Sequence, residues 1–250
     1  MNSIGTRTAV LLASALLMLS MTSCVCIGER VELVDLRTEE RTVELDGAER
    51  VVIDIDMGIG KLHIAGGSSA LLDAEFTYNV DEWTPAVEYG VKNGKGRLSI
   101  TQPDAKGKSV PDKARNEWEL SFGEEVPLEL IIDMGVGDAY LDLSDIRLTD
   151  LSVDQGVGNV KVNLVGVKTD DLRASLDGGV GEITVTVPSS IGVRVDADTG
   201  IGSFNTHGLT KRGDAFVNDA YDNSESTISL SIDAGIGKIT VTTEDGTASM

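Results

Sequence analysis

The sequence predicts an all-β protein whose main part is a parallel β-solenoid, a stack of coils built from short strands. Three observations lead to this prediction. A five-residue motif, Asp-x-Gly-(Ile/Val)-Gly, occurs six times, alternating apolar and polar residues flank its copies, and the chain after residue 23 has almost no helical periodicity. Fixed-period repeats of this kind are typical of solenoids, in which each coil packs only against its neighbours.

The first element, residues 1–23, is a predicted signal peptide. Arg7 supplies positive charge, and the apolar run at 9–19 is about half of the ~20 residues that a membrane span needs. Small residues just before a cysteine resemble a bacterial lipobox, and here they read Met21-Thr22-Ser23-Cys24. Cys24 is therefore the predicted lipidation site, carrying acyl chains such as palmitate that anchor the protein to a membrane. An ordinary secretory signal with an incidental cysteine is the alternative.

Residues 24–48, which are rich in Glu and Arg, are predicted to form a tether or the first strand. Residues 49–134 are predicted to form an N-terminal β region with an aromatic-rich insertion of antiparallel strands. Within it, residues 102–115 contain two prolines and four basic residues, which predicts an exposed loop.

Six of the ten aromatic residues lie in this N-terminal region. We expect them to form a small core beneath an open end of the solenoid. The alternative is an exposed aromatic platform for glycan or protein contact. Exposed side chains at Trp83 and Trp118 would favour the platform, and burial of both would count against it.

Residues 135–250 are predicted to form the β-helix repeats. From the third residue of one motif to that of the next, the spacing in the regular part of the array is 21, 23 and 21 residues, about one coil each. The Asp and the two Gly that recur in each of the six copies are Asp56, Gly58 and Gly60; Asp133, Gly135 and Gly137; Asp154, Gly156 and Gly158; Asp177, Gly179 and Gly181; Asp198, Gly200 and Gly202; and Asp233, Gly235 and Gly237.

Each motif position has a structural interpretation. The glycines allow positive φ and close approach of stacked turns, and the Asp side chain can accept backbone N–H bonds of the turn that follows. The central apolar residue is expected to point into the core, at Ile59, Val136, Val157, Val180, Ile201 and Ile236. These interpretations need no ligand, so no metal and no cofactor is predicted. Calcium held between stacked aspartates is the alternative.

The composition argues against two classes of function. A formal net charge of −20 excludes nucleic acid as a partner, because phosphate binding needs a basic surface. The two histidines, His63 and His207, leave little material for general-base or metal chemistry, and no set of nucleophile, base and orienting residue can be proposed. The protein is therefore not expected to be an enzyme, and no catalytic residue is predicted.

Several segments together resemble the toast-rack family. They are the repeated Gly-(Ile/Val)-Gly turns, Phe76-Thr77-Tyr78-Asn79-Val80, Arg115-Asn116-Glu117-Trp118, Val126-Pro127-Leu128-Glu129-Leu130 and Val217-Asn218-Asp219-Ala220-Tyr221. The resemblance implies a right-handed single-stranded β-helix. It also implies a relation to putative-adhesin domains and to the extracytoplasmic part of regulators of cell-wall-active antibiotic responses.

These observations lead to one functional expectation. The protein is expected to be a lipid-anchored lipoprotein of the bacterial cell envelope that faces the extracytoplasmic side. There it would act as a non-catalytic interaction module for an envelope protein, either adhesin-like or regulatory. A β-helix that binds or cleaves cell-wall glycan is the alternative. A structural protein that stacks end to end through exposed solenoid edges is a third possibility.

Overall fold

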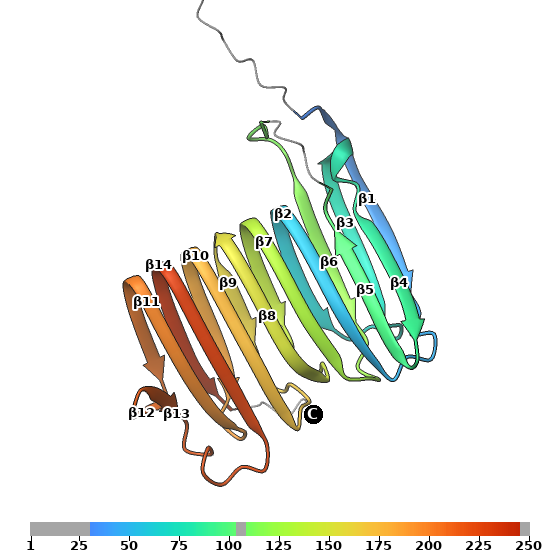
Figure 1. Ribbon diagram of the computed structural model, residues 1–250. Helices are drawn as coiled ribbons and strands as arrows, with labels where there is room; N and C mark the ends of the chain where they lie inside the picture. Colours follow the sequence, from blue (N-terminus) through green and yellow to red (C-terminus); the bar gives the residue numbers. More distant parts are fainter. Residues whose placement is uncertain (1–30, 104–108, 246–250) are drawn as a thin grey trace, which may run out of the picture.

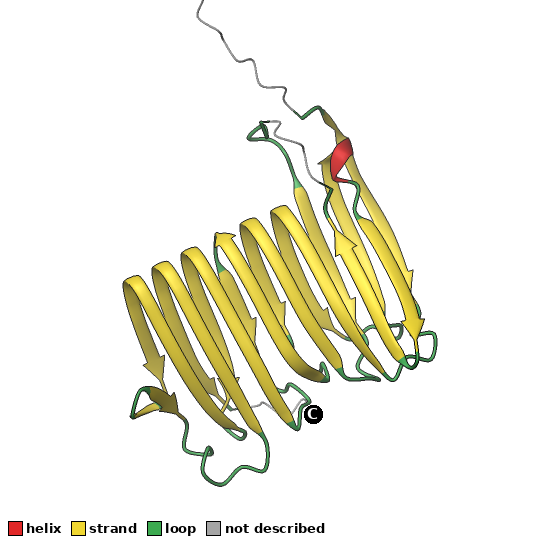
Figure 2. Ribbon diagram, in the orientation of Figure 1, coloured by secondary structure: helices red, strands yellow, loops and turns green. Residues whose placement is uncertain are grey.

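A computed structural model describes residues 31–103 and 109–245, and in them it shows one sheet of fourteen strands (Figures 1 and 2). The segment with the predicted signal peptide and Cys24 lies outside the described residues. The expected all-β class is confirmed. The strands that form the coils are β2 (Arg50–Gly66), β7 (Leu128–Asp142), β8 (Leu148–Val157) with β9 (Val160–Asn163), β10 (Asp171–Pro188), β11 (Gly192–His207) and β14 (Thr227–Glu244).

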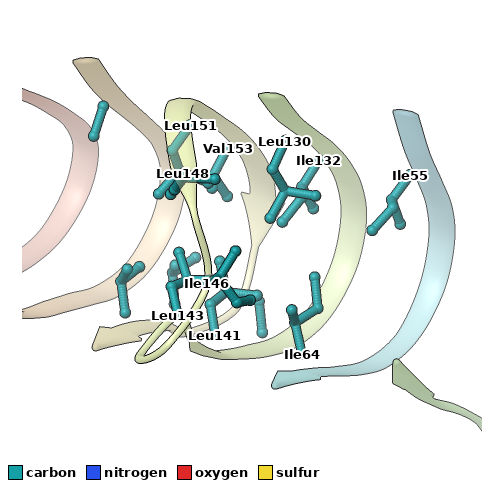
Figure 3. Close-up of a cluster of buried hydrophobic side chains, with 14 of the residues drawn as sticks. Ile55, Ile64, Leu130, Ile132, Leu141, Leu143, Ile146, Leu148, Leu151 and Val153 are labelled. Carbon is teal, nitrogen blue, oxygen red and sulfur yellow. The ribbon is translucent and has the colours of Figure 1, made fainter. Parts of the chain in front are cut away.

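Each coil is a long strand bent in its middle at the glycine motif, so that it has a first arm before the bend and a second arm after it. Neighbouring coils are parallel and in register through the bend, as where Asp177 pairs with Asp233 and Val180 with Ile236. The two arms face each other and enclose the core, which Figure 3 shows between them. Apolar side chains at every second position fill this space, among them Ile55, Ile64, Leu130, Ile132, Leu141, Leu151 and Val153.

The coils do not stack in chain order. Their spatial order is β2, β7, β8 with β9, β10, β14 and β11, so the last strand of the described chain lies between two earlier ones. The last two copies of the motif therefore stack out of chain order, with Gly235 between Gly179 and Gly200. Residues 208–226 carry the chain across the end of the stack, which lets β14 enter beside β10 in parallel.

The expected inward orientation of the central motif residue is also wrong. In the first copy, Met57 points into the core while Ile59 lies at the surface of the bend. The same holds for Val136, Val157, Val180, Ile201 and Ile236, all of which are exposed. The inward position belongs to the second motif residue, because strand alternation places the Asp outward and its successor inward. The chain then turns around the outside of the bend, which leaves the Gly-(Ile/Val)-Gly segment facing solvent.

The N-terminal end of the stack is covered by further strands. β5 (Lys95–Thr101) pairs with the first arm of β2, and β4 (Ala86–Lys92) pairs antiparallel with β5. The second arm of β2 is followed by β6 (Asn116–Phe122), β3 (Leu72–Val80) and β1 (Leu33–Val43). The one helical segment in the described residues is a 3-10 turn at Asp81–Trp83.

These covering strands refine the predicted organisation of the chain. The segment 24–48 contributes β1, and the boundary between 134 and 135 falls inside β7, so both regions supply strands to one stack. The expected aromatic core is confirmed, since Phe76, Tyr78 and Phe122 are buried here. The loop at 102–115 is not wholly exposed: Gln102 is buried against the first bend.

The bend is held together by close backbone stacking, which gives the first testable prediction. A Cβ added at Gly158, whose φ is +141°, would overlap with the carbonyl oxygen of Gly137 in the preceding coil. We expect Gly158→Ala to lower the free energy of unfolding by about 3 kcal/mol, because the backbone must separate or adopt a strained φ. Chemical denaturation measures this. Gly90→Ala in β4, where no atom lies within 4 Å of the added Cβ, is the control. Equal losses for the two variants would contradict the stacking argument.

Candidate functional surface at the bends

The motif places six carboxylates in one row along the stack, which we call the acidic ladder. Its members are exposed and follow one another in register as Asp56, Asp133, Asp154, Asp177, Asp233 and Asp198. Neighbouring strands lie about 4.8 Å apart, so like charges face each other at every step. A hollow of about 400 Å³ lies over the ladder, lined by its last four aspartates and the adjacent glycines.

The expected role of these aspartates in capping the turn is not what the structure shows. Within the described residues, no backbone N–H donates to Asp133, Asp154, Asp198 or Asp233. The coil stays hydrogen-bonded through the bend instead: the Gly158 N–H donates to the Val180 carbonyl of the next coil at 2.9 Å. At this internal bend, an N–H group that a side-chain cap could satisfy is therefore engaged in pairing between coils.

Beside the acidic ladder runs a row of exposed aliphatic side chains, which we call the apolar ridge. It consists of Ile59, Val136, Val157, Val180, Ile236 and Ile201, in that spatial order. Their exposed fractions range from 36% to 70%, and they make up six of the nine exposed large apolar residues in the described chain. Five steps of about 4.8 Å give the ridge a length of about 24 Å.

Two buried amides, which sequence reasoning missed, close the first bend. The Ile59 N–H donates to Gln102 Oε1 at 3.0 Å, and Asn116 Nδ2 donates to the Ile59 carbonyl at 2.9 Å. The Trp118 indole N–H in turn donates to Asn116 Oδ1 at 2.9 Å. These side chains satisfy the backbone groups that another coil would otherwise pair. In the sequence, Asn116 stands two residues before Trp118, but this spacing does not predict the contact with the bend unless the position of the bend is already known.

The exposed aromatic platform is not formed by the two tryptophans. Trp83 is 1% exposed and Trp118 is 0% exposed. Trp118 packs edge-on against Phe76, with ring centroids 5.3 Å apart. Trp118 belongs to the main core and Trp83 to a separate small cluster with Val31 and Val80, so burial of both indoles counts against glycan stacking there.

A groove of about 520 Å³ crosses the outer face of the second arms. His63 stacks on Tyr140 with ring centroids 4.9 Å apart, and the Lys161 ammonium lies 5.5 Å from the centroid of the same ring. The two neighbours flank the tyrosine ring, so its edge is what faces outward. Cross-strand pairs of this kind stabilise a sheet.

The structure brings together no recognisable catalytic or metal centre in the residues it describes. His63 lies on β2 and His207 at the end of β11, at opposite ends of the stack. Across residues 31–103 and 109–245, no group of three or more His, Cys, Asp or Glu side chains is placed to hold a metal ion. Nor does any helix in those residues have the length and apolar character to cross a bilayer.

Comparison with known proteins identifies the class of protein that this fold and surface define. Residues 33–186 match the N-terminal domain of toast_rack, and residues 136–241 match the family described as cell wall-active antibiotics response LiaF, C-terminal. The chain belongs to the toast-rack family. No protein of curated function matches it.

One solved structure supports this assignment, and a second similar structure has a lower score. A putative cell adhesion protein from Clostridium sporogenes is 36% identical, with a TM-score of 0.82 over 84% of this chain and 100% of the other. A putative adhesin from Bacteroides fragilis is 16% identical, with a TM-score of 0.34 over 82% of this chain and 96% of the other.

The acidic ladder generates the second prediction. Asp154→Asn removes one carboxylate from between Asp133 and Asp177, so we expect it to raise the free energy of unfolding by about 0.2–1 kcal/mol at low salt. High salt should reduce the gain by screening the repulsion. Asp112→Asn, which removes the same charge from an exposed loop, is the control. If the ladder bound calcium, chelation would lower the melting midpoint of the parent protein and Asp154→Asn would destabilise it in calcium.

Proposed function

We propose that this protein is a lipid-anchored lipoprotein of the bacterial cell envelope that acts, without catalysis, as an interaction module for another envelope protein. The observation that carries the proposal is the apolar ridge. Apolar side chains exposed in a continuous row, rather than scattered singly, are typical of surfaces that another macromolecule covers.

Strand formation alone does not explain why the ridge is apolar. Threonine is also β-branched and has a high strand propensity, and it occupies outward-facing positions elsewhere in the coils, as at Thr184 and Thr240. At the fourth position of the motif, between the two glycines, all six bends carry Val or Ile. These side chains do not fill the core, so their shared character supports contact with a partner.

The charge beside the ridge defines the chemistry of that partner. The acidic ladder follows the same bends three residues earlier, so an apolar strip meeting the ridge comes close to a row of carboxylates. A protein surface with aliphatic or aromatic side chains next to Lys or Arg would complement both rows.

The family supports the location and the class of function. One matching family is described by a response to cell wall-active antibiotics, and the Clostridium sporogenes relative is described as a putative cell adhesion protein. Both descriptions refer to processes at the cell envelope. An adhesin-like or an envelope-stress regulatory contact would each use an exposed ridge on a rigid stack.

The ridge can be tested by changing Val136, Val157 and Val180 together to Thr. The change keeps β-branching, so we expect the stability to fall by less than about 1 kcal/mol. Crosslinking in intact cells followed by mass spectrometry should recover one stoichiometric envelope protein with the parent, and at least tenfold less of it with the triple variant.

The matched control changes three serines on the outer face of the first arms to Thr, at Ser152, Ser175 and Ser231. This control variant should recover the partner at the level of the parent. Unchanged recovery with the ridge variant, or retention of cell-wall glycan without a protein partner, would contradict the proposal.

Lipid anchoring gives a separate prediction. Cys24→Ser removes the thiol that would carry the diacylglycerol, so the protein should move from the membrane fraction to the soluble fraction. Incorporation of labelled palmitate should be lost as well. Cys26→Ser, which leaves the predicted cleavage site intact, is the control and should remain in the membrane. A Cys24→Ser protein that stays membrane-bound would show that another segment holds it there.

A further inference from the structure

A second, smaller core lies at the N-terminal end of the stack, apart from the core of the coils. The buried Trp83 packs there with Val31 and Val80. Val110 and Ala114, from the loop that leads into β6, pack against this cluster. We call the part of the chain that builds it, residues 31–33, 79–83 and 109–115, the N-terminal extension.

Hydrogen bonds hold the N-terminal extension in place. The Asn79 N–H donates to the Arg115 carbonyl at 3.1 Å, and the Arg115 N–H donates to Asn79 Oδ1 at 2.6 Å. The Val31 N–H donates to the Ser109 carbonyl at 3.2 Å. Val31 is the first residue that the structure describes, so the point at which the chain leaves the stack toward its N-terminus is fixed.

This point lies on the side of the stack where the coils bend. Asn116, the first residue of β6, contacts the first bend by donating to the Ile59 carbonyl, and it pairs with Tyr78 of β3. Val80 lies two residues beyond Tyr78, about 7 Å further out, and pairs with Leu33 of β1. Figure 1 shows β1 and β3 continuing past the bends in this direction. The N-terminal extension therefore projects beyond the bends, on the side that carries the apolar ridge.

The distance from this point to the predicted lipid anchor is short. Cys24 precedes Val31 by seven residues, and even a fully extended chain covers only about 25 Å over that length. The arms of the coils run away from the bends, and the second arm of β14, from Gly237 to Glu244, is about 23 Å long. The far ends of the arms therefore lie about 30 Å from the level of Val80, which is further than the tether reaches.

We propose that the N-terminal extension places the lipid anchor on the side of the bends, so that the apolar ridge faces the membrane to which the protein is attached. The partner is then an integral protein of that same membrane. It meets the ridge with a segment close to the bilayer that is apolar and carries Lys or Arg. This inference rests on the lipid anchor and on the ridge contact proposed above.

The charges at the bends favour a protein over the lipid surface as the occupant of the ridge. On one side of the ridge, the acidic ladder supplies six carboxylates. On the other side, two residues after the ridge, the six coils carry two Lys, two acidic and two uncharged residues, so this row adds no net charge. Its members are Lys61, Asp138, Asn159, Glu182, Lys238 and Ser203. Anionic lipid headgroups repel such a face, whereas a basic segment next to a membrane span is attracted both to the headgroups and to the acidic ladder.

The shape of this side supports the same occupant. The N-terminal extension projects about 7 Å beyond the first bend, which prevents Ile59 from lying flat on a bilayer. The tether adds at most about 25 Å, so the gap between this end of the ridge and the membrane is about the width of a small domain. The ridge itself consists of Val and Ile, without the Trp and Tyr that are typical of membrane interfaces.

Fluorescence quenching tests the orientation on the full lipidated chain. A label on Val180→Cys lies at the bend of β10, and a label on Ser190→Cys lies just past the far end of the same strand. Both variants also carry Cys26→Ser, so that the introduced cysteine is the one free thiol once Cys24 is acylated. In vesicles of phosphatidylcholine and phosphatidylglycerol with a quencher on the headgroups, we expect at least threefold stronger quenching at 180 than at 190. Equal quenching, or stronger quenching at 190, would overturn the proposal.

A longer tether is the control for direct contact with lipid. About twenty Gly and Ser residues inserted after Gly28 form a flexible segment, which lets the stack turn freely above the bilayer. The ratio of quenching at 180 to quenching at 190 should then fall to about one. A ratio that stays high would show that the bends themselves bind the bilayer, and the proposed partner class would be wrong.

Photocrosslinking in intact cells tests the partner class. A photoreactive amino acid at position 180 should crosslink to an integral membrane protein, next to one of its membrane spans, at least tenfold more than the same amino acid at position 190. Crosslinks to lipid alone, or to a protein without a membrane span, would overturn the inference. A partner without a span would leave the proposed ridge contact intact. Unchanged partner recovery with the Val136, Val157 and Val180 to Thr variant would instead contradict the ridge contact itself.

Discussion

The structure depends on how closely successive backbones pass at the bend. A side chain at the second motif glycine would overlap with the carbonyl oxygen of the coil beside it, and the same contact recurs between Gly60 and Gly137, Gly137 and Gly158, and Gly158 and Gly181. This contact forces the parallel coils into one register. Because the register is shared, every outward position becomes a row along the stack, and the acidic ladder and the apolar ridge are two of these rows. The repeat that allows close backbone packing at the bends therefore also aligns the exposed side chains in rows.

The same constraint explains why the coils can be assembled out of chain order. β14 pairs with β10 through seventeen residues and with β11 through fifteen, and each pairing needs only matching glycines and alternating apolar residues. Any coil with these features fits beside any other. The connection through residues 208–226 decides the order, since it carries the chain across the end of the stack and folds part of itself into the hairpin of β12 (Thr210–Arg212) and β13 (Ala215–Val217) that covers the core.

Much of this architecture could be predicted from the sequence, and the parts that could not have a common cause. Alternation and repeat spacing identified the strands and the bends because both are local. The orientation of Ile59 and its counterparts was wrong because periodicity does not reveal that the chain turns around the outside of its own strand. The place of β14, and the closure of the first bend by Gln102 and Asn116, depend on segments 43 or more residues apart. Identifying the ridge required the geometry of the bend.

The two ends of the coil stack are closed in different ways. A solenoid built from interchangeable coils has no intrinsic limit, so its length and assembly depend on its ends. Here one end is completed by the parallel strands β5 and β6, by antiparallel strands beyond them, and by two buried amides at the bend. At the other end Asn218 and the β12–β13 hairpin complete the core while the bend of β11 retains the geometry of an internal coil. The stack therefore ends by two different means: side-chain amides satisfy the backbone of the first bend, whereas the bend of β11 is paired on one side only in the described residues.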